Sequence, residues 1–296
     1  MTDFRLKVFL SVAHHLSFTK ASKELFISQP AISKHIQELE SDFKARLFER
    51  KSNSIALTLA GKLLLQHAEG IIDKYKELEY AMHQLHGELV GELKLGASST
   101  ISQYVLPPLL AKFTSLNPQI KVSLLSGNTR EIEDALENHE IDLGFIEGNY
   151  RRSHLKYTLL LADELALIAN PQAKIGSKIK LEDLCQYPLV LREQGSGTLD
   201  VIQEVLESGH IYLKDLNIPL HLGSTESIKL FVQNSDALGI VSVRAVQSDI
   251  LLGRLREVRI ENVAFNREFC QVSLQGESSG LSVEFMKFVD KYKDKL

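Results

Sequence analysis

Serine, threonine and asparagine residues, together with one arginine and one glycine, gather at four places where a predicted strand is followed by a predicted helix. These residues are Ser98, Ser99 and Thr100; Asn128 and Thr129; Arg192, Gly195, Ser196 and Thr198; and Ser224 and Thr225. The free amides and the dipole of a helix start favour negative charge, and hydroxyl groups add donors. In open parallel sheets such junctions meet at the carboxyl ends of the strands. At one of these junctions Glu131 is placed to close a capping box on Asn128. One junction alone is usually only a helix cap, but four of them favour a cleft for a small anion.

Two charged residues are expected beside the same cleft. Arg192 could pair with a carboxylate or sulfur oxyanion of a ligand, or it could form a surface salt bridge near Glu193. Glu147 ends a predicted strand that faces the cleft. It could bind the ammonium group of an amino-acid-like effector, or it could pair with Arg192. The sequence leaves both pairs of alternatives open.

A second polar surface is predicted near the N-terminus, on a helix that follows a tight turn. Ser17 can cap the helix before the turn, Ser28 can cap the helix after it, and Pro30 suits the first turn of that second helix. An apolar stripe of Ile32, Ile36 and Leu39 would face the interior. The opposite face has no bulky apolar side chain, which suits the major groove of DNA. The residues expected to contact DNA on this helix are Ser28, Gln29, Pro30, Ser33, Lys34 and Gln37.

Three helical patterns followed by a hairpin predict a winged helix-turn-helix domain over residues 1–58. Lys51 and Asn53, in the turn of the hairpin, are expected to approach DNA. This segment holds nine Lys and Arg against six Asp and Glu, whereas the remainder holds 25 against 32. A basic module on an acidic body is typical of a regulator with separate DNA-binding and sensing parts. For the helices alone, an amphipathic pair in another all-α domain is the simpler alternative.

Residues 59–90 predict a long helix that pairs with a second copy of the chain. Apolar residues recur there at alternating spacings of four and three, as in a coiled coil. They are Leu64, Ala68, Ile71, Tyr75, Leu78, Met82, Leu85 and Leu89. This seam could instead pack against the chain's own domains. A homodimer would present two recognition helices to an inverted-repeat operator in double-stranded DNA.

The remaining residues, 91–296, predict an α/β domain of two subdomains. Strand-like apolar runs alternate with helical patterns in two rounds, which indicates parallel sheets covered by helices. Subdomain I would comprise residues 91–162 and 267–296, and subdomain II residues 163–266. The predicted fold class is therefore α+β multidomain, with a winged helix-turn-helix, a linker helix and an α/β body.

The N-terminal region also resembles the LysR-type transcriptional regulators. The matching residues are Phe9, Val12, Ala13, Ser17, Phe18, Thr19, Ala21, Leu25, Ser28, Gln29, Pro30, Ala31, Ser33, Ile36, Leu39, Glu40, Leu47, Phe48, Arg50, Leu57, Thr58, Ala60 and Gly61. In that family, residues matching Gln29, Pro30 and Ser33 lie in the major groove, and the wing approaches the minor groove. The second arginine often found in the wing is absent here, where Asn53 and Ser54 stand.

The same resemblance extends more loosely over the whole chain. It implies a linker helix that forms dimers, which in the family often pair into tetramers, and a periplasmic-binding-protein-like effector domain. RNA polymerase is a further possible partner. Within that domain, residues 191–198 and 223–229 are similar to the branch linked to sulfur assimilation.

Other classes of function find little support in the sequence. It contains no HExxH, GxGxxG or GxxxxGK[ST] motif, and its histidines lack metal-ligand spacing, so we expect no catalysis, metal or cofactor. Cys185 and Cys270 are expected to be reduced and buried, with a redox switch as the alternative. The absence of a signal peptide and of a long apolar run predicts a cytoplasmic protein without a membrane partner. The alternatives that remain are a solute-binding protein and a cytoplasmic small-molecule sensor that acts through protein partners.

Overall fold

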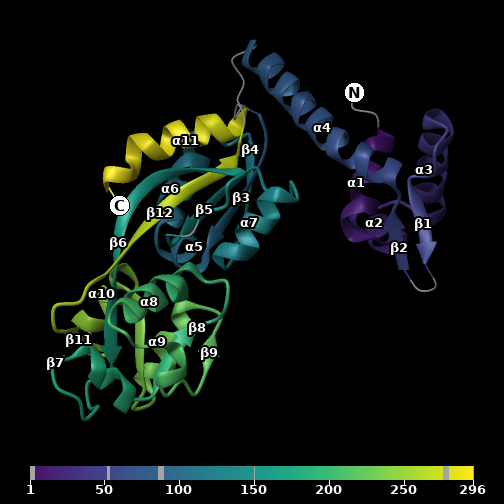
Figure 1. Ribbon diagram of the computed structural model, residues 1–296. Coiled ribbons are helices and arrows are strands. Elements are labelled where there is room, and N and C mark those ends of the chain that lie inside the picture. The colour runs from purple at the N-terminus through teal and green to yellow at the C-terminus, as the bar shows by residue number, and fades with distance from the viewer. Residues whose placement is uncertain (1–3, 52–53, 86–89, 150, 276–279, 296) are drawn as a thin grey trace. The chain divides into compact units, whose positions relative to one another are not determined.

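The computed structural model describes residues 4–51, 54–85, 90–149, 151–275 and 280–295 (Figure 1). The chain divides into two compact units, residues 1–89 and 90–296. Within the described stretches, no helix has the length and apolar character needed to cross a membrane.

The first unit is a winged helix-turn-helix followed by a long helix. Its elements are α1 (Phe4–His15), α2 (Phe18–Glu24), α3 (Gln29–Phe43), β1 (Phe48–Lys51), β2 (Ser54–Leu57) and α4 (Leu59–Leu85). The two strands form an antiparallel hairpin. The predicted caps are confirmed, because the Ser17 hydroxyl accepts from the amide of Lys20 and the Ser28 hydroxyl from that of Ala31. The apolar stripe of α3 is also confirmed, since Ile32, Ile36 and Leu39 are all buried in the core of the unit.

The apolar seam of α4 divides into two parts. Near its start, Ala68 is fully buried in the same core and Leu64 packs against it. Farther along, Ile71, Leu78 and Met82 are each at least half exposed, at 50%, 56% and 52%. The first part thus packs on its own domain, whereas the second leaves its apolar side chains available to a partner helix. Leu89 lies outside the described residues.

The first turn of α4 is held tightly against the hairpin. The Thr58 hydroxyl accepts from the amide of Gly61 at 3.0 Å and donates to the carbonyl of Arg46 at 2.6 Å. A Cβ atom on Gly61 would lie 2.1 Å from the carbonyl oxygen of Leu47. The helix can therefore begin in this position only if residue 61 has no side chain.

The two glycines of α4 give a matched test of this contact. We expect Gly61→Ala to lower the free energy of unfolding by about 1–3 kcal/mol, because the new methyl group collides with backbone. A methyl group on Gly70 would meet nothing within 4 Å outside the backbone of its own helix, so Gly70→Ala should raise stability by about 0.5–1 kcal/mol through helix propensity. Urea unfolding followed by circular dichroism measures both. Equal shifts in the same direction would contradict the proposed packing.

The second unit contains a single mixed sheet of ten strands with helices on its faces (Figure 1). Its elements are β3 (Gly91–Ser98), α5 (Ser99–Tyr104), α6 (Leu106–Leu116), β4 (Ile120–Gly127), α7 (Thr129–Glu137), β5 (Leu143–Glu147), β6 (Leu155–Ala169), β7 (Lys178–Ile179), η1 (Leu181–Gln186), β8 (Leu189–Arg192), α8 (Gly197–Ser208), η2 (Leu213–Asp215), β9 (His221–Leu222), α9 (Thr225–Gln233), β10 (Leu238–Ser242), α10 (Val243–Leu251), β11 (Arg256–Ile260), β12 (Phe265–Leu274), α11 (Leu281–Tyr292) and η3 (Lys293–Lys295).

Two halves of this unit are joined by two long strands. The first half is built on β3, β4 and β5, and the second on β8, β9 and β10, and within each half these strands pair in parallel as predicted. The prediction of wholly parallel sheets is wrong for the middle, where β6 and β12 pair antiparallel with each other and with their neighbours. The chain crosses to the second half along β6 and returns along β12, so the two strands must run in opposite directions. The predicted subdomain limits, residues 162/163 and 266/267, fall within these strands.

The two cysteines have different environments. Both are free thiols, but only Cys270 is buried, and burial raises the pKa of its thiol. The prediction that Cys185 is buried is wrong. It lies on η1, a short helix that directs Leu181 and Leu184 inward, and it follows Leu184 at a position that faces solvent.

Candidate functional site

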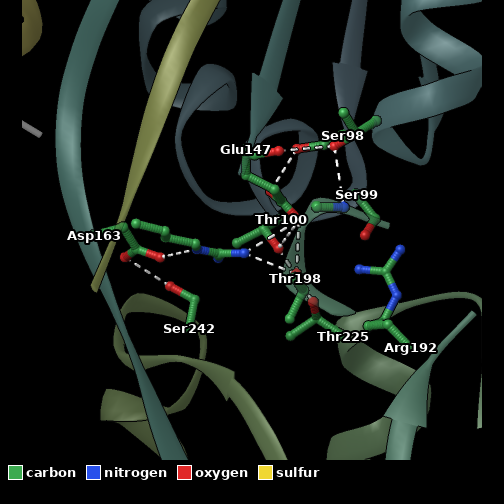
Figure 2. A network of polar contacts seen from close by, with 12 residues as sticks. Ser98, Ser99, Thr100, Glu147, Asp163, Arg192, Thr198, Thr225 and Ser242 are labelled. Atoms are coloured by element: carbon green, nitrogen blue, oxygen red, sulfur yellow. Dashed lines mark hydrogen bonds and ion pairs between the residues drawn. The ribbon is translucent and has the colours of Figure 1, made fainter. Parts of the chain in front are cut away.

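Glu147, at the end of β5, is the centre of a polar network that joins the two halves of the second unit (Figure 2). Its side chain is 1% exposed. One carboxylate oxygen accepts from the Ser98 hydroxyl at 2.6 Å, and the other accepts from the hydroxyl groups of Thr198 at 2.8 Å and Thr100 at 3.4 Å. Ser98 and Thr100 belong to the first half and Thr198 to the second. Several junctions predicted to bind an external anion therefore surround an anion that the protein itself supplies.

Arg267 on β12 compensates the charge of Glu147. Its Nη1 lies 3.3 Å from Glu147 Oε1 and donates to the Thr198 hydroxyl at 2.7 Å. Its Nε donates to Asp163 on β6 at 2.7 Å, and the Ser242 hydroxyl donates to the other oxygen of Asp163 at 2.9 Å. Arg267 and Asp163 are opposite each other on the two strands that link the halves. The network is thus a buried chain of alternating charges at the crossover.

The sequence interpretation missed Arg267 and Asp163. A signal for Arg267 was available, because it stands between Phe265 and Phe269 at the period-two spacing of one strand face. Both phenylalanines are buried, and Arg267 is buried with them. A cation on the apolar face of a strand needs a buried anion, which was a reason to look for one.

The charged state of Glu147 follows from its surroundings. Burial alone raises the pKa of Glu147, but the Arg267 and Arg192 guanidinium groups and the hydroxyls of Ser98 and Thr198 together outweigh burial. The pKa of this carboxyl is therefore below its ordinary value. Of the two sequence alternatives, pairing with arginine fits better than binding an ammonium group, since the protein's own donors occupy both oxygens. The contacting arginine, however, is Arg267 rather than Arg192.

A cavity of about 290 Å³ lies between the halves. Its lining comprises Ser99, Gln103, Ser126, Gly127, Asn128, Glu131, Glu193, Gly223 and Ser224. Of these, Ser99, Asn128 and Ser224 were predicted site residues. One wall is fixed by the predicted capping box, in which the Asn128 side chain accepts from the amide of Glu131 at 3.0 Å and the Glu131 carboxylate accepts from the amide of Asn128 at 2.8 Å.

Arg192, at the end of β8, has one side-chain nitrogen without a hydrogen-bond partner in the described part of the chain. Its Nε and Nη2 donate to the two carboxylate oxygens of Glu193 at 2.9 and 3.0 Å, so Arg192 does pair with Glu193. The pair is not the surface salt bridge of the sequence alternative, because Arg192 is buried. Arg192 is 1% exposed, and its Nη1 is buried without a hydrogen-bond partner among the described residues. The hydroxyls of Ser99 and Ser196 are likewise buried without a hydrogen-bond partner among the described residues. Figure 2 shows the Ser99 hydroxyl directed toward the Arg192 guanidinium group.

These three unpaired groups indicate what the site can bind. A buried donor without a partner costs free energy, so native structures nearly always satisfy it with protein, water or ligand. A guanidinium N–H and two hydroxyls can all donate to an oxyanion. They come from both halves, since Ser99 opens α5 in the first and Arg192 and Ser196 belong to the second.

The remaining predicted cleft residues form contacts between the halves. The Thr129 hydroxyl donates to the carbonyl of Glu147 at 3.0 Å and accepts from the amide of Gly197 at 3.3 Å. The carbonyl of Gly195 accepts from the amide of Arg130 at 3.1 Å. The hydroxyls of Thr225 and Thr100 lie 3.3 Å apart. The structure thus separates the predicted residues into a cavity group and a group that holds the halves together.

The predicted DNA-binding residues of α3 lie mostly on its solvent side. Ser28, Gln29, Pro30, Lys34 and Gln37 are exposed, and Ser33 is half-buried. Lys51 ends β1, and Asn53 lies outside the described residues. Across the described part of the chain, no group of three or more His, Cys, Asp or Glu is placed to hold a metal ion.

Removing the charge of Glu147 tests its central role. We expect Glu147→Gln to lower the free energy of unfolding by about 3–5 kcal/mol at neutral pH, because Arg267 loses one of its two buried counter-charges and keeps only Asp163. Because the pKa of Glu147 is lowered in the folded protein, its contribution is present above the unfolded-state pKa and is lost as the pH falls through the folded-state pKa. The variant should therefore lose less stability on acidification than the parent. Urea unfolding between pH 7 and pH 3 measures this, with the exposed Glu164→Gln as control. An unchanged acid profile would contradict the role.

Comparison with known proteins finds relatives of both units. Residues 4–62 match the model of the bacterial regulatory helix-turn-helix protein of the lysR family, and residues 86–292 match that of the LysR substrate binding domain. The HTH-type transcriptional regulator CysL of Bacillus subtilis (strain 168) is 31% identical over 269 residues, which cover 90% of this chain and 89% of CysL. Full-length CbnR in complex with its target DNA shares the fold, with a TM-score of 0.63 at 24% identity over 98% of this chain and 99% of CbnR. The regulatory domain of CcmR from Synechocystis PCC6803, in complex with 2-PG, has a TM-score of 0.61 at 25% identity over 69% of this chain and 97% of that domain.

Proposed function

The chain belongs to the LysR family of transcriptional regulators, and from that membership we propose that a small anionic effector bound beside Arg192 controls its binding to operator DNA. As a member, it is a transcriptional regulator with a helix-turn-helix DNA-binding domain and an effector-binding domain. The observation that carries the effector proposal is the buried Nη1 of Arg192, which lacks a partner within the described chain, as do the Ser99 and Ser196 hydroxyls.

The unpaired donors favour an oxyanion over a neutral apolar effector. Ser99 lines the cavity, and Arg192 is bonded to Glu193, which also lines it. An apolar ligand would leave the three buried donors unsatisfied, whereas a carboxylate or a sulfur or phosphorus oxyanion offers several acceptors. Glu193 already takes two donors of Arg192, and its side chain is 28% exposed and lines the cavity. An effector would therefore bind Nη1 of Arg192 or displace the Glu193 carboxylate. The complex of the CcmR regulatory domain with 2-PG supports a small ligand in this type of domain.

An effector at this position would act on the relative arrangement of the two halves. Ser99 is in the first half and Arg192 in the second, so an anion bound to both favours the conformation that holds them close together. The antiparallel strands β6 and β12 join the halves and are the natural place for a hinge. An effector that stabilises one hinge position shifts the equilibrium between two states of the regulator.

We infer that the regulator acts as a homodimer, which could pair again into a tetramer. The far part of α4 leaves Ile71, Leu78 and Met82 exposed, and pairing with a second α4 would cover them. A twofold dimer would place two α3 helices on an inverted-repeat operator. RNA polymerase is a further candidate partner of such a complex. In this proposal the protein works in the cytoplasm, where its DNA is, and catalyses no reaction.

Loss of the α3 polar groups tests the DNA-binding function. We expect Gln29→Ala combined with Ser33→Ala to weaken binding at least about tenfold to a duplex selected from random DNA by the parent protein, because base-edge hydrogen bonds are lost. Lys34→Ala should instead weaken all duplexes alike and reduce the salt dependence of binding. Fluorescence anisotropy at several salt concentrations measures both. If the parent shows no salt-sensitive, sequence-selective binding, the chain is better explained as a sensor that acts through protein partners.

Arg192→Gln tests the effector site. Calorimetry of the full chain with sulfate, thiosulfate, O-acetylserine and aromatic carboxylates should detect binding of at least one of these anions. Arg192→Gln should weaken that binding at least about tenfold, because a charged hydrogen-bond donor is lost. Glu193→Gln should leave it equal or tighter, since the competing carboxylate is neutralised. Binding that survives in Arg192→Gln, or heat from none of the anions, would contradict the proposal.

A further inference from the structure

Phe26 occupies a position that the fold of the first unit disfavours. Its side chain is 94% exposed, the largest exposed fraction of any large apolar residue in the described part of the chain. Its φ is 53°, in the left-handed region that side chains with a Cβ rarely adopt. It lies in the turn between α2 and α3.

The hydrogen bonds around Phe26 explain its backbone conformation. The amide of Leu25 donates to the carbonyl of Ala21 at 3.0 Å, and the amide of Ile27 donates to that of Ser22 at 3.2 Å. The second bond closes the six-residue loop of a Schellman motif, which needs a left-handed residue just before Ile27. Ile27 then packs against the core. Glycine or asparagine is the usual residue at such a position, and a phenylalanine ring that remains in solvent gives no packing in return.

The neighbours of Phe26 identify what its ring could contact. Ser28 caps α3 two residues later, and the first residues of α3, Gln29 and Pro30, are exposed. Lys23, in the last turn of α2, is exposed as well. Phe26 is therefore an isolated apolar group beside the polar end of the helix that the proposed function places in the major groove. Because the residues around it are polar or basic, the setting favours a polyanion with apolar edges over an apolar protein surface.

We propose that Phe26 is a DNA-contacting residue whose ring packs against apolar surface of the duplex at the edge of the major groove. The apolar groups that DNA offers there are the thymine methyl and the deoxyribose. This inference rests on the proposed DNA-binding function of α3 and adds to it a contact that carries no charge and no hydrogen bond.

Phe26→Asn tests whether the ring is needed for DNA binding without disturbing the fold. Asparagine suits the left-handed backbone, so amide exchange in α2 and α3 should slow or stay unchanged. Affinity for the duplex selected by the parent should fall about fivefold to twentyfold, because the buried apolar area of the ring is lost. The slope of affinity against salt should not change, because no cation is removed. Phe26→Leu, which keeps an apolar side chain, should lose less than Phe26→Asn.

Leu16→Asn is the matched control. Leu16 also has a left-handed φ, of 44°, and is 47% exposed, but it lies at the other end of α2, before the Ser17 cap. This variant relieves the same conformation and should leave affinity for DNA unchanged. Replacing thymine by uracil at each position of the site identifies the DNA group that the ring contacts. If Phe26→Asn costs less affinity when one position carries uracil, the ring contacts the methyl group at that position. If the loss of affinity is the same at every position, the ring contacts the sugar.

Two results would overturn the inference. The first is parent-like affinity of Phe26→Asn in an assay where Gln29→Ala with Ser33→Ala loses binding, which would leave the function of α3 intact and remove Phe26 from it. The second is faster amide exchange in α2 and α3 of Phe26→Asn, which would show that the ring stabilises the fold. If no variant of α3 affects binding, the proposed function itself fails.

Discussion

The second unit depends on the burial of one negative charge. The Glu147 side chain is almost completely buried, so its negative charge must be stabilised inside the protein. Arg267, Ser98 and Thr198, on different elements, provide this stabilisation through an ion pair and hydrogen bonds. These partners belong to both halves, which means that the halves must meet for the charge to be stabilised. Arg267 also donates a hydrogen bond to Asp163 on the opposite linking strand, so the same requirement extends to that strand. One carboxylate thus couples the packing of the halves to the strands that connect them.

The same electrostatics links this network to the cavity. Arg192 does not contact Glu147 directly, yet its positive charge helps to lower the pKa of Glu147. An anion bound at Nη1 of Arg192 would offset part of that charge and weaken its effect on Glu147. The effector proposed here would therefore be sensed by electrostatics as well as by contact, because it adds a second anion beside an internal one.

The sequence predicted what depends on neighbouring residues and missed what depends on distant ones. The caps at Ser17, Ser28 and Asn128 involve residues three positions apart, and the structure confirms all of them. The ion pair of Arg267 with Asp163 spans 104 positions, and it depends on the antiparallel pairing of strands that the alternation of elements did not reveal. The assignment of hydroxyls to Glu147 or to the cavity depends on three-dimensional direction as well. Residue type and element order therefore located the site, while the division of its residues needed coordinates.

Local conflicts between residue type and backbone carry information of a different kind. Gly61 lies in a helix, where glycine is unfavourable, but the Leu47 carbonyl leaves no room for a side chain, so the fold explains it. Gly70 lies in the same helix without any such neighbour. At Phe26 the fold would accept glycine or asparagine, yet the residue is large, apolar and exposed. When packing inside the chain explains a disfavoured residue, as at Gly61, no external contact has to be invoked. When packing gives no account of it, a contact outside the chain is the physical explanation that remains, and the adjacent polar end of α3 indicates where that contact is made.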